Sequence, residues 1–383
     1  MNFDSQKKAE DRCYFDWAAT SVYEDAGGDA PLGNPSSQHC EGRAAKFALE
    51  DARARCAAVL NVPPDTLYFT SGGTESNCIA LFSNLLRKGQ GRVISSPAEH
   101  SSIREGMEAL ERMGKPTGRI AVDSSGRVTA QTFAKALAQY GDVRFAAVMS
   151  VNNETGSITD MASLRDVIRK NSGAPVHLHC DMVQAAGKIN IDIPLWEIDS
   201  ASISAHKIGG PRGIGLLYLR RPVDVICTGG GQERRIRGGT ENIRGAAALA
   251  SCLEKHAAAE KIQSEYPAAK ARWKKLITSL AAIERCSIIP AERNNDEFSP
   301  YILQAAFKGI PGEVTARALD DLGFAVSTGS ACSSSSPERP VLVSMGIEEH
   351  LRIEGIRISQ GWTTTDTEIN LLLAAIAEVL RFL

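Results

Sequence analysis

The middle of the chain carries a lysine directly after a segment of alternating character. Residues 201–204 read Ala-Ser-Ile-Ser, and Ala205, His206 and Lys207 follow them. A strand that ends at Ser204 puts the amine of Lys207 at the carboxyl edge of a sheet, where open α/β folds bind their ligands. An amine held there can form a Schiff base with an aldehyde or ketone. For one of 43 Lys and Arg residues taken alone, an ordinary surface position explains the pattern better.

A second candidate is the aspartate within residues 177–184, which read His-Leu-His-Cys-Asp-Met-Val-Gln. Alternation along a strand puts His177, His179 and Asp181 on one face, and Cys180 with Gln184 on the other. Two histidines and a carboxylate could bind a metal, but no further ligand cluster completes a coordination sphere. A lone aspartate at the end of a buried parallel strand is instead the expected partner of a protonated heterocyclic nitrogen. We therefore favour charge pairing over metal binding for Asp181.

A glycine turn lies between a short β-branched and aromatic run and an apolar helix. It reads Thr70-Ser71-Gly72-Gly73-Thr74-Glu75-Ser76. Free backbone N–H groups and the positive end of a helix dipole make such a turn an anion site, suited to a phosphate. The motif lacks the lysine of a P-loop and the spacing of the dinucleotide fingerprint. Taken alone, a plain glycine turn with a Ser or Thr cap explains it better.

A run of small polar residues at 327–336 carries one thiol, Cys332. Small polar residues do not pack a core, so we expect an accessible loop there. A free cysteine is usually a small buried hydrophobe. A thiol on an accessible loop is therefore a candidate nucleophile, although no Lys or Arg flanks Cys332 to raise its thiolate fraction. The other eight cysteines are best explained by packing.

Composition narrows the class of protein that must position these residues. The 383 residues have a net charge of -2, so no overall field attracts nucleic acid or anionic lipid. Nine scattered cysteines without a C-x-x-C pair are typical of a reduced, cytoplasmic chain. The first residues contain no apolar stretch of the kind found in a secretory signal or a membrane anchor.

From residue 41 onward, strand-like and helix-like segments alternate, which predicts βαβ units and a mostly parallel sheet. We expect a large α/β domain over residues 13–255. A smaller α+β domain is expected over residues 256–383, joined by residues 1–12. Between them, an Ala-, Lys- and Glu-rich stretch from Glu241 to Leu280, interrupted only by Pro267, predicts two long helices. The last helix is expected to begin with a capping box formed by Thr365 and Glu368.

In this order, the phosphate turn, the aspartate and the lysine are what a fold type I pyridoxal phosphate enzyme requires. From about Tyr14 to its C-terminus the chain also resembles the cysteine desulfurases of the NifS/IscS type, in the class V aminotransferase family. The resemblance rests on Tyr14-Phe15-Asp16 with Ala18-Ala19-Thr20, Gly33 to Ser37, Thr70 to Glu75, Glu99-His100, Val151 to Gly156, Asp181 with Gln184, Ser204 to Lys207, Gly238 to Thr240, Gly329-Ser330-Ala331-Cys332, and Ile356 to Ser359.

This resemblance implies a large domain with a mostly parallel seven-stranded sheet and pyridoxal 5'-phosphate as cofactor. Lys207 would bind the cofactor covalently, Asp181 would pair with its pyridine nitrogen, Gln184 would contact its phenolic oxygen, and His100 would stack over its ring. The family implies phosphate contacts from Gly73, Thr74, Ser204 and His206, with Thr240 reaching in from the neighbouring subunit of a homodimer. Substrate contacts would come from Asn34, Asn153 and Arg357, whose planar guanidinium suits a carboxylate.

The implied reaction converts L-cysteine to L-alanine and leaves the sulfur as a persulfide on Cys332. Lys207 and His100 would move protons. The sulfur would pass to an acceptor or an iron–sulfur scaffold protein, for the synthesis of iron–sulfur clusters or other sulfur-containing cofactors. Alternatives are a selenocysteine lyase, another pyridoxal phosphate enzyme of the class V family, or a catalytically silent binding protein with this fold. The chain departs from the family in a shortened segment between Thr20 and Gly33 and in the bulky Trp17.

Overall fold

The structure is a computed structural model that describes residues 12–24, 31–87, 89, 91–171, 173–293, 296–329 and 339–383. Within these ranges, a central sheet of seven strands has the order β2-β8-β7-β6-β5-β3-β4. Only β8 runs against the others. This confirms the predicted fold class. The strands are β2 (Leu67–Thr70), β3 (Arg92–Ser95), β4 (Thr117–Arg119), β5 (Val143–Met149), β6 (His177–Asp181), β7 (Ser200–Ser204) and β8 (Gly215–Leu219).

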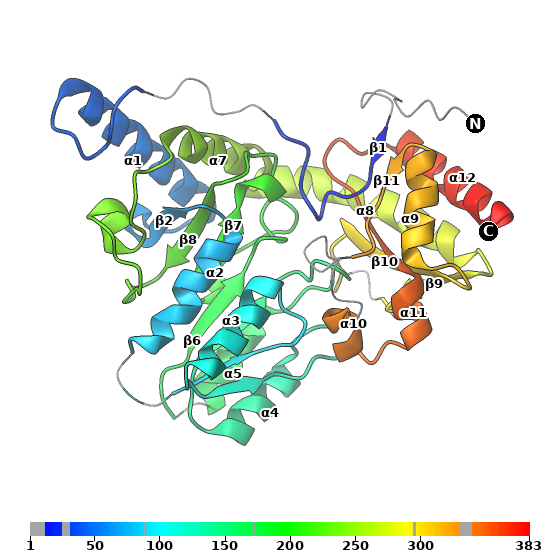
Figure 1. Ribbon diagram of the computed structural model, residues 1–383, viewed down its shortest axis with the longest axis horizontal. Coiled ribbons are helices and arrows are strands. Elements are labelled where there is room, and N and C mark those ends of the chain that lie inside the picture. Colours follow the sequence, from blue (N-terminus) through cyan, green and yellow to red (C-terminus); the bar gives the residue numbers. More distant parts are fainter. Residues whose placement is uncertain are drawn as a thin grey trace.

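Helices cover both faces of this sheet (Figure 1). Alternate residues of one strand point to opposite faces, so Phe145 packs in one apolar cluster and Ala146 in another. Helices α2 and α3 supply the first cluster, and α1, α4, α5 and α7 supply the second. The helices are α1 (Cys40–Leu60), α2 (Gly73–Phe82), α3 (Ser101–Arg112), α4 (Ala130–Tyr140), α5 (Met161–Asn171), α6 (Ile193–Trp196) and α7 (Ile243–His256), with short 3-10 turns η2 (Pro64–Thr66), η3 (Ser83–Leu85), η4 (Ala205–Lys207) and η5 (Gln232–Arg235).

The C-terminal part forms a second unit on the right of Figure 1. Its antiparallel sheet has the order β12-β10-β9, and its helices enclose a separate apolar cluster. Phe15 packs in that cluster, so the N-terminal segment lies against both units. The domain limits at 255 and 256 stay a prediction. The elements are α8 (Ala259–Ala281), β9 (Cys286–Ile289), β10 (Ile302–Phe307), α9 (Gly312–Asp321), α10 (Pro340–Ser344), α11 (Glu349–Glu354), β12 (Gly355–Ser359) and α12 (Asp366–Phe382), with β11 (Phe324–Ala325) parallel to β1 (Cys13–Tyr14).

Two long helices occupy residues 243–281, but the chain breaks between them at Ala257 and Ala258 rather than at Pro267. Pro267 lies inside α8. A proline in a helix removes one hydrogen bond, and burial of Ile262, Ala269 and Trp273 keeps α8 continuous through it. The capping box at the start of α12 is confirmed. In the described part of the chain, we find no helix with the length and hydrophobicity of a membrane span.

Candidate active site

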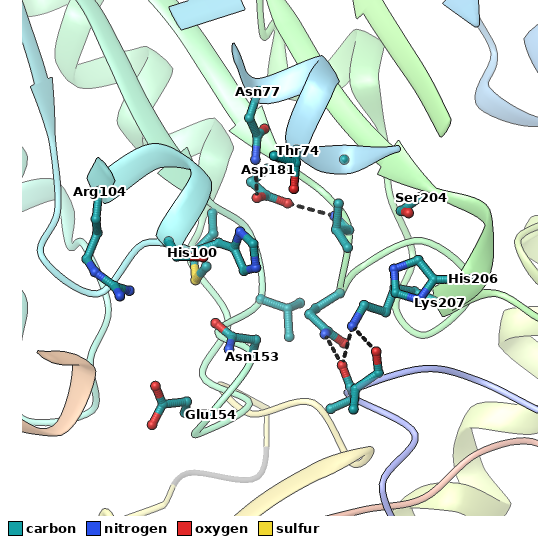
Figure 2. Close-up of a pocket in the computed structure, with 18 of the residues that line it drawn as sticks. Thr74, Asn77, His100, Arg104, Asn153, Glu154, Asp181, Ser204, His206 and Lys207 are labelled. Carbon is teal, nitrogen blue, oxygen red and sulfur yellow. Dashed lines mark hydrogen bonds between the residues drawn. The ribbon is translucent and has the colours of Figure 1, made fainter. Parts of the chain in front are cut away.

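A cavity opens where the parallel strands β5, β6 and β7 end, and residues from both units line it (Figure 2). Asp181 is the last residue of β6, while Lys207 follows β7 on the turn η4. The structure therefore brings together the two residues that strand-end reasoning selected. The lining residues are Ala18, Ala19, Gly73, Thr74, Asn77, His100, Ser101, Arg104, Met149, Val151, Asn153, Glu154, Asp181, Val183, Gln184, Ser204, His206, Lys207 and Arg357.

Two donors hold the carboxylate of Asp181. Its Oδ2 accepts from Asn77 Nδ2 at 2.8 Å, and its Oδ1 accepts from the backbone N–H of Val183 at 3.0 Å. The side chain is 5% exposed. Hydrogen bonds from these two donors fix the orientation of the carboxylate. Asp181 is thus an oriented acceptor at the floor of the cavity, suited to a protonated ring nitrogen.

The amine of Lys207 faces the N-terminal segment. Its Nζ donates to the carbonyl oxygens of Ala18 and Ala19, each at 2.6 Å. The same segment continues to Ser21, whose Oγ donates to His206 O at 2.8 Å. Short residues at 18 and 19 let the backbone reach the amine, so the position of Lys207 depends on residues far away in sequence.

The N-terminus of α2 faces the cavity beside Ser204. Gly72 is the N-cap residue with φ of 154°, and because glycine has no side chain it cannot cap the helix by a side-chain hydrogen bond. At Gly73, an added Cβ would lie 2.6 Å from Val183 Cγ2, so a larger residue would push the turn away from β6. Backbone N–H groups of the first helical turn lack partners within the helix. The N-terminus of α2 is therefore a candidate anion site, suited to a phosphate.

His100 and His206 are both held neutral by their surroundings. His100 is the N-cap of α3, and burial lowers its pKa. Burial, with the nearby charge of Lys207, lowers the pKa of His206 to about 4. A neutral ring can lie against an aromatic cofactor or donate to a phosphate without the desolvation cost of a charge.

Gln184 connects the N-terminal segment to a buried lysine. Its Nε2 donates to Ala18 O at 2.8 Å, and its Oε1 accepts from Lys188 Nζ at 2.7 Å. Lys188 is 2% exposed, and burial lowers its pKa to about 7. Both ends of the Gln184 amide are therefore fixed. Lys188 was not selected from the sequence, because one lysine after a helical turn has no distinctive pattern.

At the opposite end of the cavity, Arg357 projects from β12. Its Nη2 donates to Asp16 Oδ1 at 2.8 Å and its Nη1 to Asn153 O at 3.0 Å. The guanidinium is buried, and its Nε has no hydrogen-bond partner among the described residues. The Oδ1 of Asn153 is likewise buried without a partner there. Buried polar atoms of this kind are costly unless a ligand satisfies them.

Two predicted residues, Asn34 and Thr240, are not among those that line this cavity. Asn34 is exposed, and its Oδ1 accepts from the N–H of Ser36 at 2.9 Å. Thr240 is exposed as well, so its predicted action in a neighbouring subunit stays a prediction. Cys332 lies outside the described residues. Four lining residues were not selected from the sequence: Asn77, Ser101, Arg104 and Met149. Asn77 could have been selected because it is a polar residue at a helix position that the apolar periodicity predicts to be buried.

The histidine pair on β6 is engaged in hydrogen bonds. His177 Nε2 and His179 Nδ1 each lie 2.7 Å from Ser200 Oγ, and His179 Nε2 lies 2.9 Å from Asn77 Oδ1. Among the described residues, no group of three or more His, Cys, Asp or Glu side chains is placed to hold a metal. His177 and His179, which lie on the same face of β6, are therefore part of a hydrogen-bonded network.

Comparison with known proteins agrees with this geometry. The family described as "Aminotransferase class-V" matches residues 29–372. The chain belongs to this family. It is 35% identical over 364 residues to a NifS/IcsS protein homolog of Lactobacillus delbrueckii, covering 91% of this chain and 90% of the relative.

Similarity extends to a cysteine desulfurase IscS of Vibrio cholerae, at 34% identity over 89% of this chain and 84% of that protein. Among solved structures, one titled "NIFS-LIKE PROTEIN" superposes with a TM-score of 0.88 at 31% identity, covering 97% of this chain and all of that one. These findings confirm the resemblance to NifS/IscS-type cysteine desulfurases that the motifs indicated.

Proposed function

We propose that this class-V family member is a pyridoxal phosphate-dependent cysteine desulfurase that converts L-cysteine to L-alanine. The observation that carries the proposal is the joint placement of Lys207, Asp181 and the α2 N-terminus around one cavity. The relatives named cysteine desulfurase support the same activity. The amine of Lys207 suits the aldehyde of this cofactor, and the carboxylate of Asp181 suits its ring nitrogen. The anion site at the N-terminus of α2 suits its phosphate.

When bound, pyridoxal phosphate supplies an electron sink for the carbanion formed at the substrate α-carbon. The chain supplies the rest. Asp181 would favour a positive charge on the ring nitrogen, and Gly73, Thr74, Ser204 and His206 would hold the phosphate. Gln184 would contact the phenolic oxygen. The amine of Lys207 would be the group that moves protons.

Arg357 and Asn153 orient the substrate carboxylate at the other end of the cavity. The guanidinium keeps a planar pair of donors in place through Asp16 and Asn153 O. A carboxylate that binds there gains charge-assisted hydrogen bonds. Both Arg357 and Asn153 line the cavity, so such a carboxylate would lie within reach of their side chains.

The sulfur step uses the thiol of Cys332 as its nucleophile. Its thiolate attacks the substrate sulfur, the bond between sulfur and the β-carbon breaks, and the electron pair of that bond returns to carbon. Protonation then yields alanine, while a disulfide-type S–S bond leaves a persulfide on Cys332. Cysteine and a thiol thus give alanine and a persulfide, with no outside oxidant.

The finer assignments are also part of this proposal. The enzyme acts as a cytoplasmic homodimer in which Thr240 reaches the phosphate of the neighbouring site. Its persulfide passes to a sulfur acceptor, such as a scaffold protein for iron–sulfur cluster assembly. A charge of -2 over 383 residues agrees with protein or small-molecule acceptors rather than nucleic acid.

Substitution of Cys332 tests the sulfur step. The protein loaded with cofactor is incubated with L-cysteine, alanine is quantified, and the persulfide is located by mass spectrometry. We expect Cys332→Ser to lower alanine formation by about 10³-fold or more, because the nucleophile is removed. The matched control is Cys227→Ser, since Cys227 is an exposed free thiol. Alanine formation at the parent rate in Cys332→Ser would contradict the proposal, and a strong preference for L-selenocysteine would identify a selenocysteine lyase.

A further inference from the structure

A chain of hydrogen bonds runs from the floor of the cavity to His100, with Asn77 at its centre. Asn77 Nδ2 contacts both Asp181 Oδ2 at 2.8 Å and Ser102 Oγ at 2.9 Å. Ser102 Oγ lies 2.9 Å from His100 Nδ1. On its other side, Asn77 Oδ1 lies 2.9 Å from His179 Nε2. Asn77 and His179 are at most 1% exposed, so water does not compete for these bonds.

The carboxylate of Asp181 sets the direction of every bond in this chain. A carboxylate only accepts, so the Asn77 atom beside it must be the NH2 group. The same NH2 group donates to Ser102 Oγ, which leaves the hydroxyl proton of Ser102 free to donate to His100 Nδ1. The Oδ1 of Asn77 then accepts, so His179 must carry its proton on Nε2.

The remaining bonds agree with that direction. With its proton on Nε2, a neutral His179 accepts at Nδ1 from the hydroxyl of Ser200, 2.7 Å away. Ser200 Oγ in turn accepts from His177 Nε2 at 2.7 Å. Burial lowers the pKa of His177 to about 4 and that of His179 to about 3, so both rings are neutral at pH 7. Each hydrogen bond of the chain then has one direction.

A second observation fixes His100 independently of Asn77. His100 is the N-cap of α3, and its Nδ1 accepts from the backbone N–H of Ser102 at 3.2 Å. A backbone N–H can only donate, so Nδ1 must carry a lone pair. Burial lowers the pKa of His100; the charge on Asp181 acts against this shift, while Lys207 and Arg104 add to it. The one proton of the neutral ring therefore lies on Nε2.

We propose that His100 is a fixed hydrogen-bond donor through Nε2–H, and that Asn77 and Ser102 are the positioning residues that hold it in this tautomer. His100 lines the cavity beside Asp181 (Figure 2). Without a lone pair on Nε2, the ring cannot remove a proton from the substrate. If the proposed desulfurase function holds, His100 stabilises negative charge by donation, and Lys207 is the group that takes up protons.

The tautomer is measured directly by 15N NMR of protein with labelled histidine, with and without bound cofactor. The chain has seven histidines, and the signal of His100 is identified by its loss in His100→Gln. We expect one pyridine-type nitrogen at Nδ1 and one N–H at Nε2 from pH 6 to pH 8. A proton on Nδ1, or a doubly protonated ring at pH 7, would overturn the proposal.

Variants test the positioning residues. Asn77→Ala removes the donor to Ser102, so we expect the fraction of His100 in the minor tautomer to rise several-fold. The control is Asn84→Ala, because Asn84 is equally buried on η3 and donates only to Ala80 O and Leu81 O. Should Asn77→Ala fail to fold, Ser102→Ala removes the hydroxyl and gives the same readout. An unchanged tautomer in the variants would exclude the role of Asn77 and Ser102. None of these readouts depends on sulfur transfer.

Discussion

The two ends of the cavity differ in how completely their buried polar atoms are hydrogen-bonded. At the Asp181 end, Asn77 and His179 use their donors and acceptors within the protein. At the Arg357 end, three buried atoms of residues that line the cavity lack hydrogen-bond partners in the described part of the chain: Asn153 Oδ1, Glu154 Oε2 and Arg357 Nε. Arg339 Nη2 and Glu154 Oε2 form an ion pair at 3.5 Å without hydrogen-bond geometry.

This difference separates a preorganised end from a receptive one. A fully bonded network is rigid and costs no reorganisation when charge develops beside it. Unpaired polar atoms raise the free energy of the empty site and are stabilised when a ligand pairs with them. The preorganised Asp181 end therefore suits a cofactor that stays bound. The receptive Arg357 end suits a substrate that binds and leaves in every catalytic cycle.

Asp181→Asn should have the largest effect, because it removes the charge and sets an NH2 group against the NH2 group of Asn77. We expect kcat/KM for L-cysteine to fall by about 10²–10³-fold, as for other losses of preorganised electrostatic stabilisation. Cofactor affinity should fall with it. Steady-state kinetics and equilibrium dialysis of the cofactor measure both. If kcat/KM and cofactor affinity stay near those of the parent protein, the hydrogen-bonded Asp181 end is not required for catalysis.

Arg357→Lys should act on the receptive end alone. An ammonium cannot make the contacts to Asp16 and Asn153 O and also offer a planar pair of donors. We expect the KM for L-cysteine to rise by about tenfold to a hundredfold, equivalent to about 1.4–2.8 kcal/mol. The visible absorbance of the bound cofactor should not change. If KM stays constant while cofactor is lost, the assignment of the two ends must be reversed.

Lys188→Met should have the smallest effect on turnover, below about threefold, since Lys188 acts only through Gln184. Its effect on stability depends on pH. Burial lowers the Lys188 pKa to about 7, against about 10.4 in an unfolded chain, so the unfolded state binds more protons between these values. Parent stability should rise from pH 7 toward pH 10, and the Met variant should lack this rise. Urea unfolding at pH 6.5 and pH 9 measures it, and equal pH dependence in both proteins would refute the lowered pKa of Lys188.

Strand-end reasoning predicted how Asp181 and Lys207 meet, because parallel strands present their carboxyl ends at one edge. It could not predict the network behind them. Asn77, Ser102 and His179 come from two helices and a strand, and their contacts depend on how α2 and α3 pack on the sheet. The break at Ala257 was missed for a related reason, since burial of one face of α8 outweighs the local preference of Pro267. The order of the motifs predicts which residues belong to the site. The direction of each hydrogen bond can be assigned only from the packed structure.

The N-terminal segment couples the two ends of the cavity. Asp16, which holds the guanidinium, is separated by only one residue from Ala18, whose carbonyl accepts from Lys207 and Gln184. Peptide units are planar and nearly inextensible, so only the φ and ψ rotations of the intervening residues separate the position of Asp16 from that of Ala18. The residues that hold the guanidinium of Arg357 and those that hold the amine of Lys207 are therefore parts of one short stretch of backbone.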